Sequence, residues 1–314
     1  MTIEEIDAFL AVVECKTLSL AADKLFISQS TISQRLKRLE NELGTKLFLR
    51  QQGQRSTALT SAGTNLVPMA QQWSSLWRDM YSLNTFTGKT DLSIGSVDLV
   101  NSISFVPLYK KMLMNHPEIQ LDINTHHSSE IHSLLENRVI DIGFVFSPVK
   151  YPDIISTPLF SEKMYLISRR SNGYYDNIST SELDSQKEAY LKWNADYELW
   201  HHSNWSQTRH LINVNTGTNI IHYLDEPGSW TIGPSSLIRF MRRQKEIAFY
   251  QLKEAPPPLV CYQLTHRYPK PSRLDGLKAF RREAELYIKS NKTMTWLDAA
   301  PPDGENSSSK PASE

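Results

Sequence analysis

The sequence predicts a protein of the α/β class, in which a helical N-terminal unit precedes a domain of alternating strands and helices. Apolar residues recur at helical spacing from Ile3 to Val13 and again within residues 19–44. After residue 90, short apolar strands alternate with helical stretches. With 314 residues the chain is longer than one domain usually is, so we expect two or three compact units.

Residues 19–44 have the pattern of two helices joined by a tight turn. Ser19 is the expected N-cap of the first helix and Ser28 that of the second, which ends at Gly44. The second helix carries an apolar stripe that we expect to be buried, made of Ile32, Leu36, Leu39 and Leu43. Two helices, a tight turn and a polar leading edge are typical of a helix-turn-helix.

The polar residues at the start of the second helix point away from its apolar stripe. Hydroxyls and amides there can bond base edges, basic side chains can reach phosphates, and the helix N-terminus attracts a phosphate. The alternative is a solvated surface helix, because helix-turn-helix patterns also arise by chance. The candidate DNA-binding residues of this helix are Ser28, Gln29, Ser30, Thr31, Ser33, Gln34, Arg35 and Lys37.

A short hairpin is expected directly after these helices. Residues 48–50 and 56–58 can pair as strands around Gly53, which permits the turn. This hairpin has the position of a wing, with Arg50 and Arg55 as candidate phosphate or minor-groove contacts. A wing at this place weakens the chance explanation of the helix-turn-helix pattern.

The charge distribution supports the same interpretation. The net charge of the chain is +0, so any basic site must be local. Between Lys24 and Arg55 there are seven basic and two acidic side chains, a local net charge of +5. The composition, 40% hydrophobic and 22% charged, is that of an ordinary soluble protein.

A long amphipathic helix is expected from Thr60 to about Leu83, with Pro68 as a point of bending. Such a helix needs a partner, and we expect it to pair with a second copy of itself. The alternative is packing on the body of its own protomer. Its apolar face consists of Leu66, Met69, Ala70, Trp73, Leu76, Trp77, Met80 and Leu83.

The rest of the chain predicts a parallel α/β sheet followed by a disordered tail at 299–314. Strands are expected at 92–97, 119–123, 140–146, 189–193, 211–214 and 230–232. Helices are expected at 106–112, 131–135, 198–209, 235–243 and 273–290.

Several segments resemble the LysR-type transcriptional regulators. They are AFLAVVECKTLSLAADKLFISQSTISQRLKRLENELGTKLFLR, then ALTSAG, LSIGSV, HPEIQLDI and VIDIGFVF. The resemblance implies a winged helix-turn-helix DNA-binding domain at 1–59 and a linker (dimerisation) helix and hinge at 60–88. It implies an effector-binding domain at 89–298, built of two α/β subdomains like a periplasmic solute-binding protein. Subdomain I is expected at 89–162 and 267–298, and subdomain II at 163–266, with chain crossings near 161–168 and 260–267.

Carried over from the family, the recognition positions are Gln29, Ser30, Ser33 and Gln34. The family often has Pro or a small residue where Ser30 stands, and commonly a basic residue where Gln34 stands. Here Arg35 follows one place later, about 100° around the helix. We therefore expect a base preference different from that of relatives.

A ligand in an open α/β sheet binds beyond the C-terminal ends of the strands, near helix N-termini. The strand ends here offer hydroxyls and N–H groups that suit a carboxylate or other small anion, whereas Asp98 would meet an amine or hydroxyl. The alternative is that these groups only cap helices. The candidate effector-binding residues are Ser96, Asp98, Asn101, Ser102, Thr125, His127, Ser128, Phe146, Ser147, Trp193, Thr216 and Trp230, and the same strand ends also carry His126 and Asn215.

No metal or other cofactor is expected. Cys15 and Cys261 stand far apart, and the pairs His126–His127 and His201–His202 have no companion at metal-ligand spacing, so we interpret them as ordinary residues. The motifs HExxH, GxxxxGK[ST] and GxGxxG are absent, which disfavours an enzyme. Because neither a signal peptide nor a membrane-spanning apolar run is seen, a cytoplasmic location is expected.

The leading hypothesis is therefore a transcriptional regulator that responds to a small-molecule effector in the cleft between its subdomains. Its expected partners are double-stranded DNA with an interrupted inverted repeat, the unidentified effector, and further copies of the chain. A homodimer through the linker helices is expected, with assembly to a homotetramer and contact with RNA polymerase, and no membrane. The alternative is a cytoplasmic module that binds a small solute and carries a vestigial DNA-binding domain.

Overall fold

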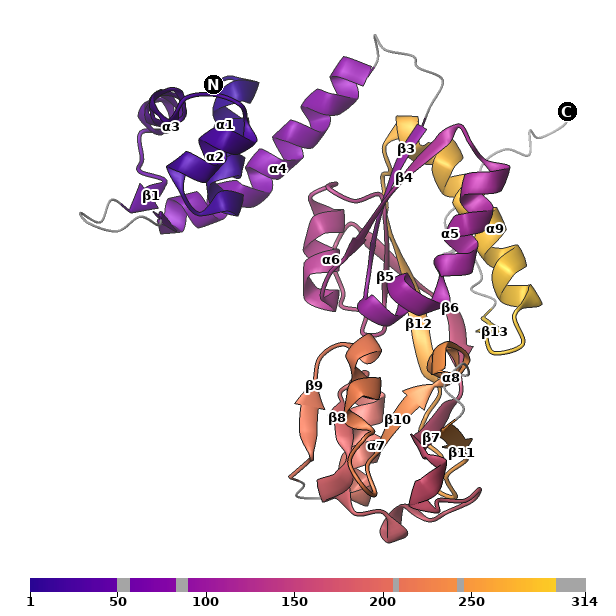
Figure 1. Ribbon diagram of the computed structural model, residues 1–314. Coiled ribbons are helices and arrows are strands. Elements are labelled where there is room, and N and C mark those ends of the chain that lie inside the picture. Colours follow the sequence, from indigo (N-terminus) through magenta and orange to yellow (C-terminus); the bar gives the residue numbers. More distant parts are fainter. Residues whose placement is uncertain (50–56, 83–89, 206–208, 242–245, 298–314) are drawn as a thin grey trace, which may run out of the picture.

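A computed structural model describes residues 1–49, 57–82, 90–205, 209–241 and 246–297 (Figure 1). These residues form a small helical domain, a long helix that continues from it, and a domain of two lobes. Among the described residues, no helix is long and apolar enough to cross a membrane. Arg50, Arg55, Leu83 and the expected tail at 299–314 lie outside the described residues.

The N-terminal domain packs three helices around one core, namely α1 (Ile3–Cys15), α2 (Leu18–Lys24) and α3 (Gln29–Leu43). Strand β1 (Phe48–Leu49) pairs antiparallel with β2 (Ala58–Leu59), which makes the base of the expected wing. Thr17 caps α2, because its hydroxyl accepts from the backbone N–H of Leu20. The expected cap at Ser19 is therefore wrong by two residues.

Helix α3 begins and ends where the sequence predicted. The Ser28 hydroxyl accepts from the backbone N–H of Thr31 at 3.1 Å, and Gly44 ends the helix at φ +67°. Of the predicted stripe, Leu43 is exposed, whereas Ile32, Leu36 and Leu39 are buried. Glu40 takes the buried place at this end, since its carboxylate accepts from the Lys46 ammonium at 2.7 Å and the Leu47 N–H at 2.9 Å.

Helix α4 (Ser61–Ser82) is the predicted linker helix, and Pro68 lies inside it. Its first half packs against α1 through the buried Ala70. Leu66 of the predicted apolar face is half-buried against the same core. The exposed members of that face in the single chain are Met69, Trp73, Leu76, Trp77 and Met80.

The first lobe, subdomain I, holds a six-stranded sheet in the order β13-β6-β12-β5-β3-β4. Helices α5 (Val106–Asn115) and α9 (Leu274–Ser290) cover one face, α6 (Ser128–Glu136) covers the other, and a π-helical segment, Val100–Ser104, precedes α5 (Figure 1). The strands are β3 (Thr90–Ser96), β4 (Ile119–Thr125), β5 (Ile142–Val145), β6 (Ile154–Glu162), β12 (Leu259–His266) and β13 (Thr295–Trp296).

The second lobe, subdomain II, holds the antiparallel sheet β10-β7-β11 and a separate parallel pair, β8 and β9. Its helices are α7 (Ala195–Asn204) and α8 (Ser235–Met241). The strands are β7 (Met164–Arg169), β8 (Ala189–Leu191), β9 (Ile212–Val214), β10 (Trp230–Pro234) and β11 (Ile247–Tyr250). Short 3₁₀ turns occupy Arg170–Asn172, Thr180–Glu182, Ser185–Lys187 and Gly217–Tyr223 in this lobe, and Pro271–Arg273 in the first.

Two features of the sheets differ from the sequence prediction. The first sheet is mixed, since β3 runs parallel to β4 and β5 while β12 runs antiparallel to β5 and β6. The chain passes from the first lobe to the second between Glu162 and Met164, and it returns between Tyr250 and Leu259. The second crossing therefore lies earlier than the expected 260–267, because pairing of β12 with two first-lobe strands places residues 259–266 in that lobe.

Candidate functional site

The leading edge of α3, residues 28–37, presents polar side chains to solvent. Thr31 and Arg35 are half-buried, and the exposed members are Ser28, Gln29, Ser30, Ser33, Gln34 and Lys37. The Ser28 hydroxyl lies 2.7 Å from that of Ser30 and 2.8 Å from that of Thr31. Because Ser28 also caps the helix, it holds the edge in place. The longer side chains of Gln29, Gln34 and Lys37 on this edge are exposed.

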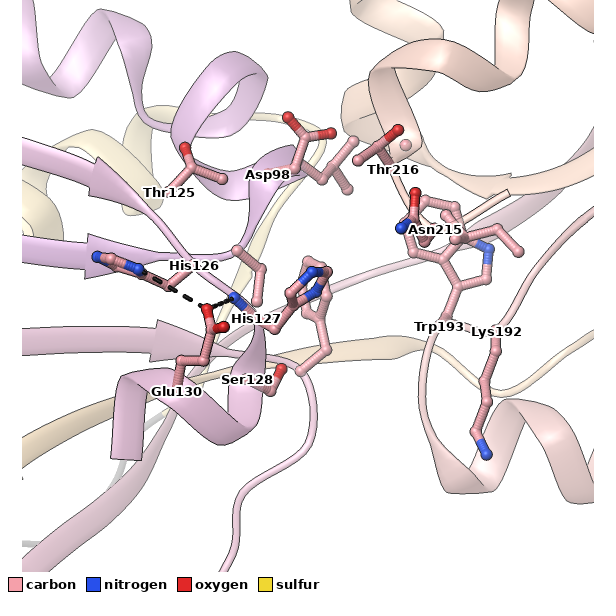
Figure 2. Close-up of a pocket in the computed structure, with 15 residues that line it drawn as sticks. Asp98, Thr125, His126, His127, Ser128, Glu130, Lys192, Trp193, Asn215 and Thr216 are labelled. Carbon is pink, nitrogen blue, oxygen red and sulfur yellow. Dashed lines mark hydrogen bonds and ion pairs between the residues drawn. The ribbon is translucent and has the colours of Figure 1, made fainter. Parts of the chain in front are cut away.

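A second site lies between the two lobes, where a cavity of about 450 Å³ opens (Figure 2). Its walls follow the C-terminal ends of β3, β4 and β5 on one side and of β8 and β9 on the other. Each of these two groups of strands is parallel, so their carboxyl ends meet at one edge, where ligands of such sheets bind. The volume suits a small organic molecule.

Seven of the twelve predicted effector residues line this cavity: Asp98, Thr125, His127, Ser128, Phe146, Trp193 and Thr216. Phe146 and Trp193 come from different lobes, and their rings meet edge to face at 6.3 Å. The Trp193 indole also donates to the carbonyl of Ile232 at 2.8 Å, which fixes its ring in the wall.

The other five predicted residues do not line the cavity. Ser96 is fully buried beneath it, and Trp230 is a core residue whose indole donates to the carbonyl of Asp184. Asn101 stands behind the wall, where its amide donates to the Thr125 hydroxyl at 2.7 Å. Ser102 donates to Asp98, and Ser147 lies one residue beyond the end of the lining segment at Phe146.

The cavity also has lining residues outside the predicted set: Val97, Leu99, His126, Glu130, Leu191, Lys192, Asn215 and Gly217. Six of them are immediate neighbours of predicted residues, so taking both neighbours of each predicted residue would have found them, whereas Leu191 is the last residue of β8. Glu130 could be found only from the helix geometry, because it is the third residue of α6 and its carboxylate accepts from the N–H of His127 at 3.1 Å. A Cβ at Gly217 would lie 3.2 Å from the side chain of Leu99 in the opposite lobe, a tight contact that a glycine avoids where the lobes meet.

Asp98 connects the two lobes. One carboxylate oxygen accepts from both the N–H and the hydroxyl of Thr218 in the second lobe, at 3.2 and 3.0 Å. The other oxygen accepts from the Ser102 hydroxyl at 3.1 Å. Both oxygens therefore have partners within the protein, which makes Asp98 a strut between the lobes.

The remaining charges of the cavity are also engaged. The Lys192 ammonium turns away from the cavity and lies 2.6 Å from the Glu198 carboxylate (Figure 2). The Glu130 carboxylate stands at the start of α6, 3.8 Å from the ring of His126. The N-terminal end of α6 opens onto the cavity next to Ser128, with first-turn N–H groups that the helix itself cannot bond.

Comparison with known proteins identifies the family. Residues 3–64 match the family model described as a bacterial regulatory helix-turn-helix protein of the lysR family, and residues 88–284 match the LysR substrate binding domain. The chain belongs to the LysR family. It is a LysR-type transcriptional regulator, with a DNA-binding helix-turn-helix and an effector-binding domain.

Curated relatives of the regulator are similar over much of its length. It is 28% identical over 179 residues to the transcriptional regulator YofA of Bacillus velezensis, which covers 55% of this chain and 60% of that one. It is 27% identical over 261 residues to the regulator SoxR of an Arthrobacter species, which covers 81% of this chain and 87% of that one.

Solved structures share the fold. A full-length OxyR variant from Pseudomonas aeruginosa superposes with a TM-score of 0.68 at 19% identity, over 96% of this chain and 99% of that one. The LysR family regulator CbnR superposes with a TM-score of 0.68 at 20% identity, over 90% and 99% of the two chains. CbnR in complex with its target DNA gives 0.67 at 20% identity, over 90% and 100% of the two chains.

Proposed function

We propose that this LysR-type regulator binds an interrupted inverted repeat as a homodimer, with one α3 in the major groove of each half-site. The observation that carries the proposal is the exposed polar edge of α3 beside a fixed helix start. An amide such as that of Gln34 can bond an adenine at two points, and the exposed Lys37 can contact a phosphate. Gln29 and Ser33 share this edge and complete the surface that reads bases.

The homodimer is proposed to form through α4. Five large apolar side chains are exposed along this helix in the single chain, namely Met69, Trp73, Leu76, Trp77 and Met80. An exposed apolar stripe of this size usually marks an interaction surface. Pairing of two identical α4 helices around a two-fold axis, the commonest symmetry of homo-oligomers, would bury it. Assembly of two dimers to a homotetramer and a contact with RNA polymerase belong to the same proposal, as family expectations.

The effector is proposed to be a small molecule with a carboxylate or another anionic group. Asp98 and Lys192 already have charged or polar partners, so neither offers a free charge to a ligand. The N-terminal end of α6 then supplies the attraction through the first-turn N–H groups of Ser128 and Ser129 and the helix dipole, which favour negative charge. Glu130 and the N-cap residue His127 bond each other at the same end. The hydroxyls of Ser128 and Thr216 stand beside it.

The test of the DNA-binding proposal is a fluorescence-anisotropy titration of the full chain with the duplex that lies upstream of its own coding sequence. A random duplex of equal length at the same salt concentration is the control, since the phosphate contribution is common to both. We expect tighter binding to the upstream duplex. Equal affinity for both would contradict sequence-specific binding and favour a solute-binding module with a vestigial DNA-binding domain.

The test of the effector proposal is a thermal-shift screen of the full chain against small carboxylates, phosphates and matched amines. A ligand that binds only the folded state raises the unfolding temperature with its concentration. We expect stabilisation by anions and none by amines of equal size. Stabilisation by amines alone would contradict the assignment of the α6 end as the anchoring group.

A further inference from the structure

A second cluster of titratable groups lies inside subdomain II, outside the set of residues that lines the effector cavity. The Glu188 carboxylate is fully buried. One of its oxygens, Oε2, lies 2.7 Å from Nε2 of His201 and 3.2 Å from Nδ1 of His210. The three groups can each turn one ligand atom to a common point, since these atoms lie within 4.8 Å of one another.

The charge of Glu188 requires compensation, because a buried carboxylate is costly unless a positive group accompanies it. In the described part of the chain, its ion-pair partners are the two histidines alone, and no lysine or arginine pairs with it. Its second oxygen, Oε1, is buried and has no hydrogen-bond partner there. Tyr197 stands nearby, and burial, with the carboxylate as a further cause, raises its pKa well above the usual value, so it stays a neutral phenol.

Aromatic rings hold the two imidazoles in place. The Tyr190 ring stacks on His210 with centroids 4.3 Å apart and planes 8° from parallel. Trp205 packs against His201 at 4.8 Å. His201 therefore belongs to a different environment from its neighbour His202, which is exposed and bonds the carbonyl of Glu198.

We propose that Glu188, His201 and His210 form a binding site for a divalent first-row transition ion, with Zn²⁺ as its representative. Two imidazole nitrogens and one carboxylate oxygen are a ligand set typical of Zn²⁺ and its neighbours, whereas Mg²⁺ and Ca²⁺ prefer oxygen alone. Metal–ligand bonds of about 2.0–2.1 Å in a tetrahedral arrangement place ligand atoms about 3.3 Å apart, so the 2.7 Å pair must open slightly. Three protein ligands leave a fourth position for water.

The proposed metal site would link α7 to β8 and β9, the two strands whose C-terminal ends form one wall of the effector cavity. Glu188 directly precedes β8, His210 lies two residues before β9, and His201 is in α7. The opposite ends of β8 and β9 lead to Lys192 and Asn215, which line the cavity (Figure 2). A bound ion would therefore fix the starting points of two strands whose far ends meet the effector.

The test uses the full chain after treatment with a chelator and desalting. Co²⁺ is titrated in and its visible ligand-field absorption recorded, then Zn²⁺ is added to displace it. We expect one ion per chain and a rise of the thermal unfolding midpoint with Zn²⁺. His210→Ala and Glu188→Gln should each weaken binding more than about 100-fold, because loss of a ligand exceeds the effect of losing an outer partner.

The matched control is His202→Ala, which removes the neighbouring histidine of the same helix and should leave metal binding unchanged. Should the ligand substitutions unfold the domain, protection of the more accessible His210 from diethyl pyrocarbonate by Zn²⁺ in the unaltered chain tests the ligand set. The proposal is overturned if no ion binds, if all three variants bind equally well, or if Zn²⁺ leaves the reactivity of His210 unchanged. Stabilisation by mild acid without any effect of metal would instead identify an imidazolium–carboxylate cluster.

Discussion

The edge of α3 that we propose reads DNA and the cavity that we propose binds the effector are built in opposite ways. The first comes from one continuous stretch, residues 28–37, and the buried side of the same helix fixes its direction. The second is assembled from five strand ends between Val97 and Gly217, contributed by two lobes.

Because of this difference, substitutions at the two sites should affect different properties of the protein. An exposed side chain of the α3 edge other than the N-cap Ser28, such as Gln34, contacts little of its own protein, so its replacement should alter DNA binding and leave folding intact. A residue near the cavity, such as Asp98, also holds the lobes together, so its replacement should alter stability as well. Substitutions at the two sites and at the α4 helix can test this separation.

The largest effect is expected at the proposed α4 dimer interface, which would hold the α3 edges of two chains at a fixed spacing. Trp77→Glu places a charge in the proposed α4 interface, at a cost of several kcal/mol if water cannot reach it. We expect a lower mass in sedimentation, lost binding to the upstream duplex, and an effector domain that remains folded.

The control for this change is Leu199→Glu, because Leu199 is a large apolar residue of α7 that is 73% exposed. That variant should keep both its mass and its DNA affinity. If Trp77→Glu also keeps both, α4 is not the interface; if it unfolds the whole chain, Trp77 packs within its own protomer.

The second effect concerns the chain crossing below the cavity. Burial raises the pKa of Glu162 from 4.5 to about 7, opposed in part by its hydrogen bonds with Ser236. Since the folded state holds the proton more tightly, this group contributes stability that is full below pH 4.5 and is lost as the pH rises to about 7. The loss amounts to about 3 kcal/mol.

Glu162→Gln removes that titration, so the difference in unfolding free energy between variant and wild type should change by this amount across the same interval. Denaturant unfolding at a series of pH values measures it. A difference that stays constant with pH would show that Glu162 has an ordinary pKa.

The third effect isolates the α3 edge. Gln34→Ala should cost ~1–3 kcal/mol on the upstream duplex and little on random DNA, because a lost base contact affects only the sequence that it reads. Anisotropy titrations on both duplexes measure the loss. Asn41→Ala, at the far end of the same helix, should change neither affinity, and equal losses on both duplexes for Gln34→Ala would mean that it only positions the backbone.

The smallest effect concerns the strut between the lobes. Asp98→Ala removes the bonds to Thr218 and Ser102, and because the site is partly solvated we expect a loss of about 1 kcal/mol in unfolding free energy. Small-angle scattering should show a larger radius of gyration. Asp275→Ala, at an exposed carboxylate of α9, should change neither quantity; an unaltered radius for Asp98→Ala would show that other contacts hold the lobes.

The sequence by itself determined the local elements, because their causes lie within a few residues. The Ser28 cap, the Gly44 end and the buried residues Ile32 and Leu39 follow from side-chain chemistry at fixed helical spacing. The strand ends that line the cavity could also be predicted from the sequence, since parallel strands bring their carboxyl ends to one edge of the sheet. The same reasoning failed for Trp230, whose apolar ring could serve a wall or the core equally well.

Only the tertiary structure decided which distant residues meet. Pairing of β12 with β5 and β6 moved the second crossing, and the bond from Asp98 to Thr218 joins residues 120 positions apart. The same holds for Glu188, His201 and His210, which no short spacing connects. Of these three, only His201 was interpreted from the sequence, as an ordinary histidine. The physical reason is that contacts between lobes and between separate strands depend on how whole helices and strands pack. Short-range patterns of apolar and polar residues do not determine that packing.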